Sequence, residues 1–163
     1  MSNTDRMHRT APFRTVLAAL LMAMVLAGPL SAAEADIQTA LDASLIKVLQ
    51  HLRNINDMTT SISDLDYRLA ASNLLEMGQL LYERVDTTSL LLELRTGMRD
   101  RADREFVQLR LVQRMQLVGK DCERVRKFMN ESLGRARSPA LVSAGEKLRD
   151  ELATACALVQ TIK

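Results

Sequence analysis

The amino-acid sequence predicts an all-α protein, an antiparallel four-helix bundle that follows an N-terminal signal peptide. Beyond the signal peptide the chain contains one proline, Pro139, and is rich in Leu, Ala, Arg and Glu, which is a helical composition. Runs in which Val, Ile, Thr or Tyr alternate with polar residues, as strands require, are too few to build a sheet. Apolar residues instead recur at spacings of three and four in four segments, which predicts four amphipathic helices with short connections.

The N-terminal segment has the pattern of a signal peptide. Three arginines precede an unbroken run of eleven apolar residues, 16–26, and small residues follow it. This run is shorter than the ~20 residues that span a bilayer, which favours a signal peptide over an uncleaved anchor. Cleavage is expected after Ala33 or Ala35, so that 1–33 is the signal peptide and 34–163 the helical domain. We expect the mature domain in the periplasm or outside the cell, with no membrane span.

The first two helices are predicted on either side of a short polar segment. The first spans about 36–58 and carries the apolar stripe Leu41, Leu45, Val48, Leu52 and Ile55. Short polar side chains then favour a break, and Ser63 to Asp66 has a capping pattern that starts the second helix. One face of that helix carries Tyr67, Ala70, Leu74, Met77 and Leu81. Breaks near Ser89 and near Gly97 both suit its end, and we expect the turn near Gly97.

The last two helices have clearer starts. The third begins between Arg99 and Ala102, and its stripe is Leu111, Met115, Val118, Cys122, Val125 and Met129. Ser138 as N-cap and Pro139 at the first helical position predict the start of the fourth. The fourth helix has the most regular stripe, which consists of Leu141, Gly145, Leu148, Leu152, Ala155, Val159 and Ile162.

The two cysteines of the chain, Cys122 and Cys156, are predicted to form a disulfide. Both lie in the part expected to be exported, and an even pair in an oxidising compartment is typical of a disulfide. Bridged residues of a helical hairpin must lie at equal heights above the turn, and Cys156 is about 25 Å above Pro139 at the helical rise. The third helix must therefore continue past Gly134, to about Arg137. A reactive thiol would need a neighbouring base or a Cys-x-x-Cys pair, and the sequence has neither.

The sequence contains little that suggests catalysis or a cofactor. His51 is the one histidine after the signal peptide, and no phosphate loop, nucleophile–base set or metal motif accompanies it. Haem ligation by His51 and a methionine would need one of Met58, Met77, Met98, Met115 and Met129. Methionines at helical spacing are typical core residues. We therefore expect no catalytic residue, no metal, no cofactor and no enzymatic activity.

The sign of the charge changes along the domain. Residues 34–94 carry 10 acidic and 4 basic side chains, whereas 95–137 carry 12 basic and 6 acidic ones. Either the basic helix lies against acidic helices and is neutralised internally, or it forms a binding face for an anionic partner. The domain as a whole has 19 charges of each sign, which argues against a nucleic-acid partner. An anionic membrane surface is a weaker alternative than a protein.

Apolar residues exceed a single stripe in two segments, 90–94 and 106–118. Such segments are either central in the bundle or part of a contact with another protein. The candidate contact residues are Phe106, Leu109, Arg110, Val112, Arg114 and Leu117. We expect an exported bundle that works by protein–protein interaction, as an adaptor, chaperone-like or assembly protein, with a homodimer among the candidate complexes. The alternative is a bundle that binds an apolar or haem-like ligand between its stripes.

Overall fold

A computed structural model describes residues 32–60 and 64–162. It contains four helices in this part of the chain, α2 (Ala32–Thr60), α3 (Leu65–Gly97), α4 (Arg101–Arg135) and α5 (Pro139–Thr161). These residues include no strand, and the predicted all-α four-helix bundle is confirmed. The predicted signal peptide, except for its last two residues, lies outside the described residues.

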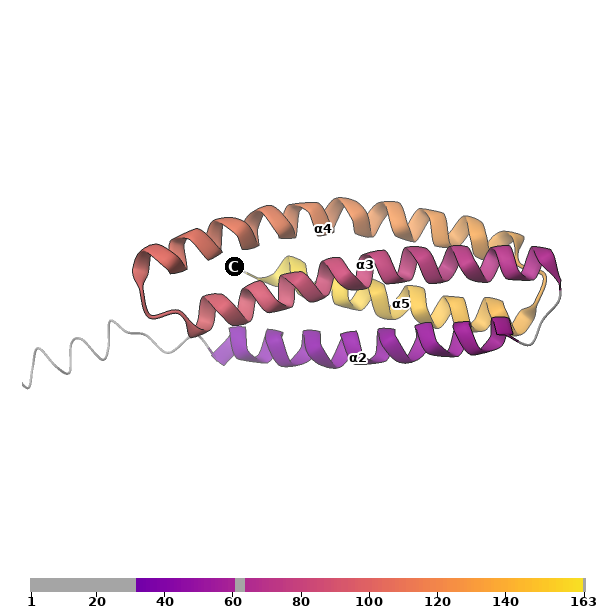
Figure 1. Ribbon diagram of the computed structural model, residues 1–163, viewed down its shortest axis with the longest axis horizontal. Coiled ribbons are helices and arrows are strands. Elements are labelled where there is room, and N and C mark those ends of the chain that lie inside the picture. The colour runs from indigo at the N-terminus through magenta and orange to yellow at the C-terminus, as the bar shows by residue number, and fades with distance from the viewer. Residues whose placement is uncertain (1–31, 61–63, 163) are drawn as a thin grey trace, which may run out of the picture. The chain divides into compact units, whose positions relative to one another are not determined.

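Successive helices run antiparallel within the compact unit Glu34–Lys163 (Figure 1). Side-chain hydrogen bonds identify neighbouring helices: Ser44 of α2 donates to Glu151 of α5, and Ser89 of α3 donates to Asp42 of α2. An ion pair joins α3 to α4, and a disulfide joins α4 to α5. In Figure 1, α4, α3 and α2 lie one below another, and α5 passes behind α3.

Two glycines bring α3 and α5 into close contact across the bundle. A Cβ on Gly78 of α3 would lie 3.0 Å from a methyl carbon of Leu148 of α5. A Cβ on Gly145 of α5 would lie 2.9 Å from a methyl carbon of Leu74 of α3. Both distances are shorter than ordinary carbon–carbon contacts, so the missing side chains allow this approach. The interior between α3 and α5 is therefore filled at these two levels.

Capping side chains determine where three of the helices begin. Asp64, Asp100 and Ser138 each accept a hydrogen bond from a backbone N–H in the first turn of α3, α4 and α5, respectively. The predicted starts of the last two helices are confirmed. The cap of α3 is Asp64, which lies within the predicted start at Ser63 to Asp66; Ser63 itself is outside the described residues. Asp64 has extended backbone angles, so its carboxylate reaches the N–H of Tyr67 at 3.0 Å.

The helix ends agree with the sequence to within a few residues. The second predicted helix ends at Gly97, as expected. Helix α4 continues past Gly134 but ends at Arg135, two residues before the expected Arg137. Helix α2 is longer than the expected 36–58, because the Ala-rich residues before Asp36 are good helix formers.

The core consists of the predicted stripes with a few exceptions at their edges. Every predicted stripe residue of α2 and α5 is buried. Tyr67 and Met77 of α3 and Met115 and Cys122 of α4 are half-buried and pack against the core from its edge. A second, smaller cluster consists of Leu92, Leu111 and Ile162.

Candidate interaction face

Most of the surplus apolar side chains of 106–118 lie at the surface. Phe106 is 59% exposed, Leu109 57%, Leu117 46% and Val112 39%. The same segment buries Val107, Leu111 and Val118, which face the core. The interpretation that the surplus is central in the bundle is therefore wrong for these four residues, because one helix face already satisfies the core.

The predicted contact residues do not all share one face. Arg110 is exposed, and its guanidinium carbon lies 5.3 Å from the ring centre of Phe106, a cation–π contact. Arg114 is half-buried. Val112 lies on the side of α4 that faces α5, where it lines a shallow depression together with Gln160.

Three exposed apolar residues of α4 form a stripe beside α3. Phe106, Leu117 and Phe128 are spaced by eleven residues, and a helix makes about three turns over that length, so they lie on one line. Asp121 lies one turn after Leu117 and contacts Arg84 of α3, which places this line on the α3 side of α4. We call these three residues the α4 stripe.

A matching stripe runs along α3. Leu69, Leu80 and Leu91 are also spaced by eleven residues; the first two are 55% and 37% exposed, and Leu91 is half-buried. Arg84 lies one turn after Leu80 and contacts α4, so this line lies on the α4 side of α3. We call these leucines the α3 stripe, and the surface formed by both stripes the α3–α4 face.

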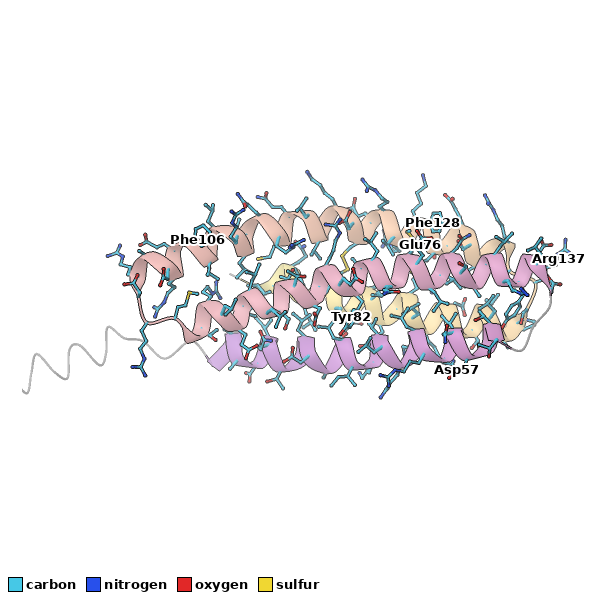
Figure 2. The ribbon with its side chains drawn as sticks, viewed as in Figure 1. Asp57, Glu76, Tyr82, Phe106, Phe128 and Arg137 are labelled. Atoms are coloured by element: carbon cyan, nitrogen blue, oxygen red, sulfur yellow. A yellow bond between two sulfur atoms is a disulfide. The ribbon has the colours of Figure 1, made fainter. Side chains whose placement is uncertain are left out.

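Further apolar residues extend this face, and Figure 2 locates part of it. Leu65 is 69% exposed, and Leu94, three residues after Leu91, is 52% exposed. Figure 2 shows Phe128 of α4 next to Glu76 of α3, where the two helices lie side by side. Leu69, Leu80 and Phe128 are not among the contact residues predicted from the sequence. Their eleven-residue spacing would have revealed them.

The centre of the α3–α4 face is an ion pair. Nε of Arg84 lies 2.8 Å from Oδ2 of Asp121, whose side chain is 11% exposed. Nη1 of Arg124 lies 3.7 Å from Oδ1 of the same carboxylate. Neither Arg84 Nε nor Asp121 Oδ2 makes a hydrogen bond within the described residues, so the attraction is between charges without good donor alignment.

Of the cations in the basic segment 95–137, Arg95 pairs with an acidic helix, since its Nη2 lies 2.7 Å from Oε1 of Glu34 of α2. Within residues 32–60 and 64–162, the ion pairs of α4 cations go to acids of α4 itself, from Arg101 to Glu105 and from Arg124 to Asp121. In the ion pair that joins α3 to α4 the acid belongs to α4. Direct ion pairs with the acidic helices therefore neutralise Arg95 in the described residues, whereas most cations of α4 are exposed.

The cysteines lie on the opposite side of α4. Cys122 and Cys156 are joined in a disulfide with their Cα atoms 6.3 Å apart, and no described cysteine is free. A groove of about 200 Å³ lies beside it, between α4 and α5. Its lining is apolar apart from three charged residues: Glu123, Arg126 and Arg149.

Apart from Met98, the methionines considered for haem ligation belong to the core or pack against it. His51 is half-buried on α2, while Met129 is in the core and Met58, Met77 and Met115 pack against it. Among the described residues, no group of three His, Cys, Asp or Glu side chains could hold a metal ion.

Tyr82 has a raised pKa, chiefly because burial disfavours its phenolate, and secondly because the Asp86 carboxylate repels it.

No protein-family model matches the chain, and no curated protein or solved structure matches it significantly. None of the helices in the described part of the chain is long and apolar enough to cross a bilayer. The functional inference therefore depends on the geometry of the described residues.

Proposed function

We propose that this protein is an exported helical bundle that acts by binding a protein through its α3–α4 face. The observation that supports this most is the pair of apolar stripes on adjacent helices, in which five of the six side chains are exposed. Monomeric proteins rarely expose contiguous apolar patches larger than a few hundred Å² unless the patch binds something. A disulfide and a leader-like N-terminus support export.

The composition of the face supports a protein partner rather than a small ligand. Aromatic and arginine side chains are enriched at protein interfaces, where rigid rings anchor the contact. Here two phenylalanines belong to one stripe, and Arg110 stacks on one of them. Exposed Arg110 and Arg124 on the same helix also favour a partner that brings carboxylates.

Site-specific photo-crosslinking in the exporting cell tests this proposal. A photoreactive residue replaces Phe106 or Leu117, and a matched control carries it at Ile46, which is 58% exposed on α2. We expect protein adducts from both positions of the face and none from Ile46. Equal labelling from all three positions, or no adduct from the face, would contradict the proposal.

A second candidate function is the binding of a small apolar ligand in the groove between α4 and α5. The support for it is the groove of about 200 Å³ beside the disulfide, with Arg126 and Arg149 among its lining residues. Native mass spectrometry and an absorption spectrum of the exported protein test it. A bound small molecule that is lost in Ala153→Trp would favour this function, and a ligand-free spectrum and mass would exclude it.

A further inference from the structure

We propose that the partner of the α3–α4 face is a second copy of this chain, which forms a dimer whose two-fold axis runs parallel to the helices. This inference rests on the proposed function, because it assigns an occupant to the same face. Such an axis places α3 of each copy over α4 of the other copy. A rotation about an axis parallel to the helices leaves the height of every residue unchanged, so the fit can be judged from one copy.

Two contacts between α3 and α4 define these heights. The ion pair between Arg84 and Asp121 places these two residues at the same height along the helix axes. The hydrogen bond between Arg95 and Gln108 does the same for that pair. The two helices are antiparallel, so each residue further along α3 is level with one about as much earlier on α4.

The two apolar stripes interleave at these heights. Leu80 precedes Arg84 by four residues, so it is level with a position four residues after Asp121, between Leu117 and Phe128 of α4. Leu91 is correspondingly level with a position between Phe106 and Leu117. Across the dimer axis, each of these leucines of one copy therefore meets a gap in the α4 stripe of the other copy. Apolar side chains that fall between those of a partner helix are the pattern of close helix packing.

Exposed charges of opposite sign lie beside the apolar stripes on the two helices, and the lysines of α4 lie at the edge that borders α5. Glu76 and Glu83 are exposed on α3, and Lys120 and Lys127 are exposed on α4. Counted from the Arg95–Gln108 contact, Glu83 is level with Lys120 and Glu76 with Lys127, twelve and nineteen residues away on each helix. Counted from the Arg84–Asp121 pair, each glutamate lies two residues, or about 3 Å, from its lysine in height. Within the described residues none of these four side chains forms an ion pair. The proposed axis puts each glutamate opposite a lysine of the second copy.

The charges also exclude the other simple arrangement. A two-fold axis that lay in the face but ran across the helices would place α3 over α3 and α4 over α4. Glutamates would then oppose glutamates and lysines would oppose lysines, which opposes association. The charge pattern therefore selects the axis parallel to the helices.

The size of the face suits a stable dimer. At the helical rise, the length from Leu69 to Leu94 is about 40 Å, and two adjacent helices are about 20 Å wide. The resulting area of about 800 Å² is what each partner buries in a standard protein–protein interface.

The mass of the purified protein in solution tests the dimer. The full coding sequence is expressed with export, and the oxidised protein is measured by sedimentation equilibrium over a range of concentrations. We expect twice the mass of the mature chain for the wild type and a monomer for Leu117→Glu and Leu80→Glu. Ile46→Glu introduces the same charge at an exposed apolar side chain of α2, outside the proposed interface, and this variant should remain a dimer. Circular dichroism should show the same helicity for all variants, because none of the three side chains is in the core.

A charge exchange tests the arrangement within the dimer. Glu83→Lys should weaken dimerisation at least tenfold, because it would oppose Lys120 of the second copy. The double variant Glu83→Lys with Lys120→Glu should recover most of the loss. A double variant that dissociates as readily as the single one would overturn the proposed axis.

The outcomes separate this inference from the proposed function. A wild-type monomer at about 100 µM, or a dimer that persists in Leu117→Glu, would overturn the dimer. If crosslinks from Phe106 then lead to a different protein, the proposed function holds and the second copy is not its partner. If the face gives no crosslink in the cell, both proposals fail.

Discussion

Arg84 on α3 and Asp121 on α4 lie 2.8 Å apart between the two apolar stripes of the α3–α4 face. Their ion pair establishes which residues of the two helices are level, and it is the reference for the proposed dimer. Asp121 is mostly shielded from water, whereas one third of the Arg84 side chain is exposed. The pair therefore joins the exposed face to the buried core.

Loss of the arginine should leave Asp121 poorly compensated. Arg84→Met keeps the aliphatic stem and removes the charge that neutralises a shielded carboxylate, so we expect the free energy of unfolding to fall by about 1–3 kcal/mol. Urea denaturation measures the change. The matched control is Arg101→Met, whose ion pair with Glu105 is exposed and should contribute less than about 1 kcal/mol. Equal effects of the two substitutions would contradict this account.

The space beside two glycines near the turn between α4 and α5 predicts opposite outcomes for their replacement by alanine. A Cβ at Gly145 would lie 2.5 Å from a methyl carbon of buried Leu133, so Gly145→Ala should destabilise the fold by about 1–3 kcal/mol despite the better helix propensity of alanine. Gly134 has nothing within 4 Å of such a Cβ. Gly134→Ala should therefore leave stability unchanged or raise it by up to about 1 kcal/mol. Thermal unfolding of both variants gives the comparison.

Removal of the disulfide should lower stability without removing the helices. Cys122 and Cys156 are separated by 34 residues, and the entropy of an unfolded chain with a loop of that length gives a stabilisation of about 4 kcal/mol. The double variant Cys122→Ser with Cys156→Ser should show this loss in urea denaturation. Treatment of the wild type with reductant should reproduce it and should have no effect on the double variant. A reductant effect on the double variant would show that the loss has another cause.

The raised pKa of Tyr82 predicts a loss of stability in alkali. The folded state holds the phenol proton more tightly than the unfolded chain, whose tyrosine has the ordinary pKa of 10.0. The contribution of protonated Tyr82 to the free energy of unfolding is fully present below pH 10.0. This contribution decreases as the pH rises through the raised pKa of Tyr82 in the folded state. Absorbance titration of a Tyr67→Phe variant, in which Tyr82 is the remaining tyrosine of the chain, measures this pKa. Asp86→Asn should lower it towards 10.0, because it removes the repelling carboxylate.

Local patterns were sufficient to predict the helices and their limits. Ser138 followed by Pro139 marks the start of α5, and Gly97 marks the end of α3, because caps and breakers act on the backbone within one turn. The pairing of Cys122 with Cys156 required α4 to pass Gly134, and the helix does so. Helical rise is nearly constant, so distances along a single hairpin can be calculated without the rest of the fold.

The four helices, their approximate ends and the stripe that each presents to the core follow from the amino-acid sequence. What covers the other faces of the helices depends on how the helices pack together. Periodicity shows that Phe106 and Leu117 lie apart from Val107 and Leu111 on α4, but either set could have been buried, and the packing of α3 and α5 chose the second. Likewise, the charge balance could not reveal that Asp121 pairs with Arg84 and that most cations of α4 are exposed. Helical pattern is a local property, whereas burial depends on which helices arrive from distant parts of the chain.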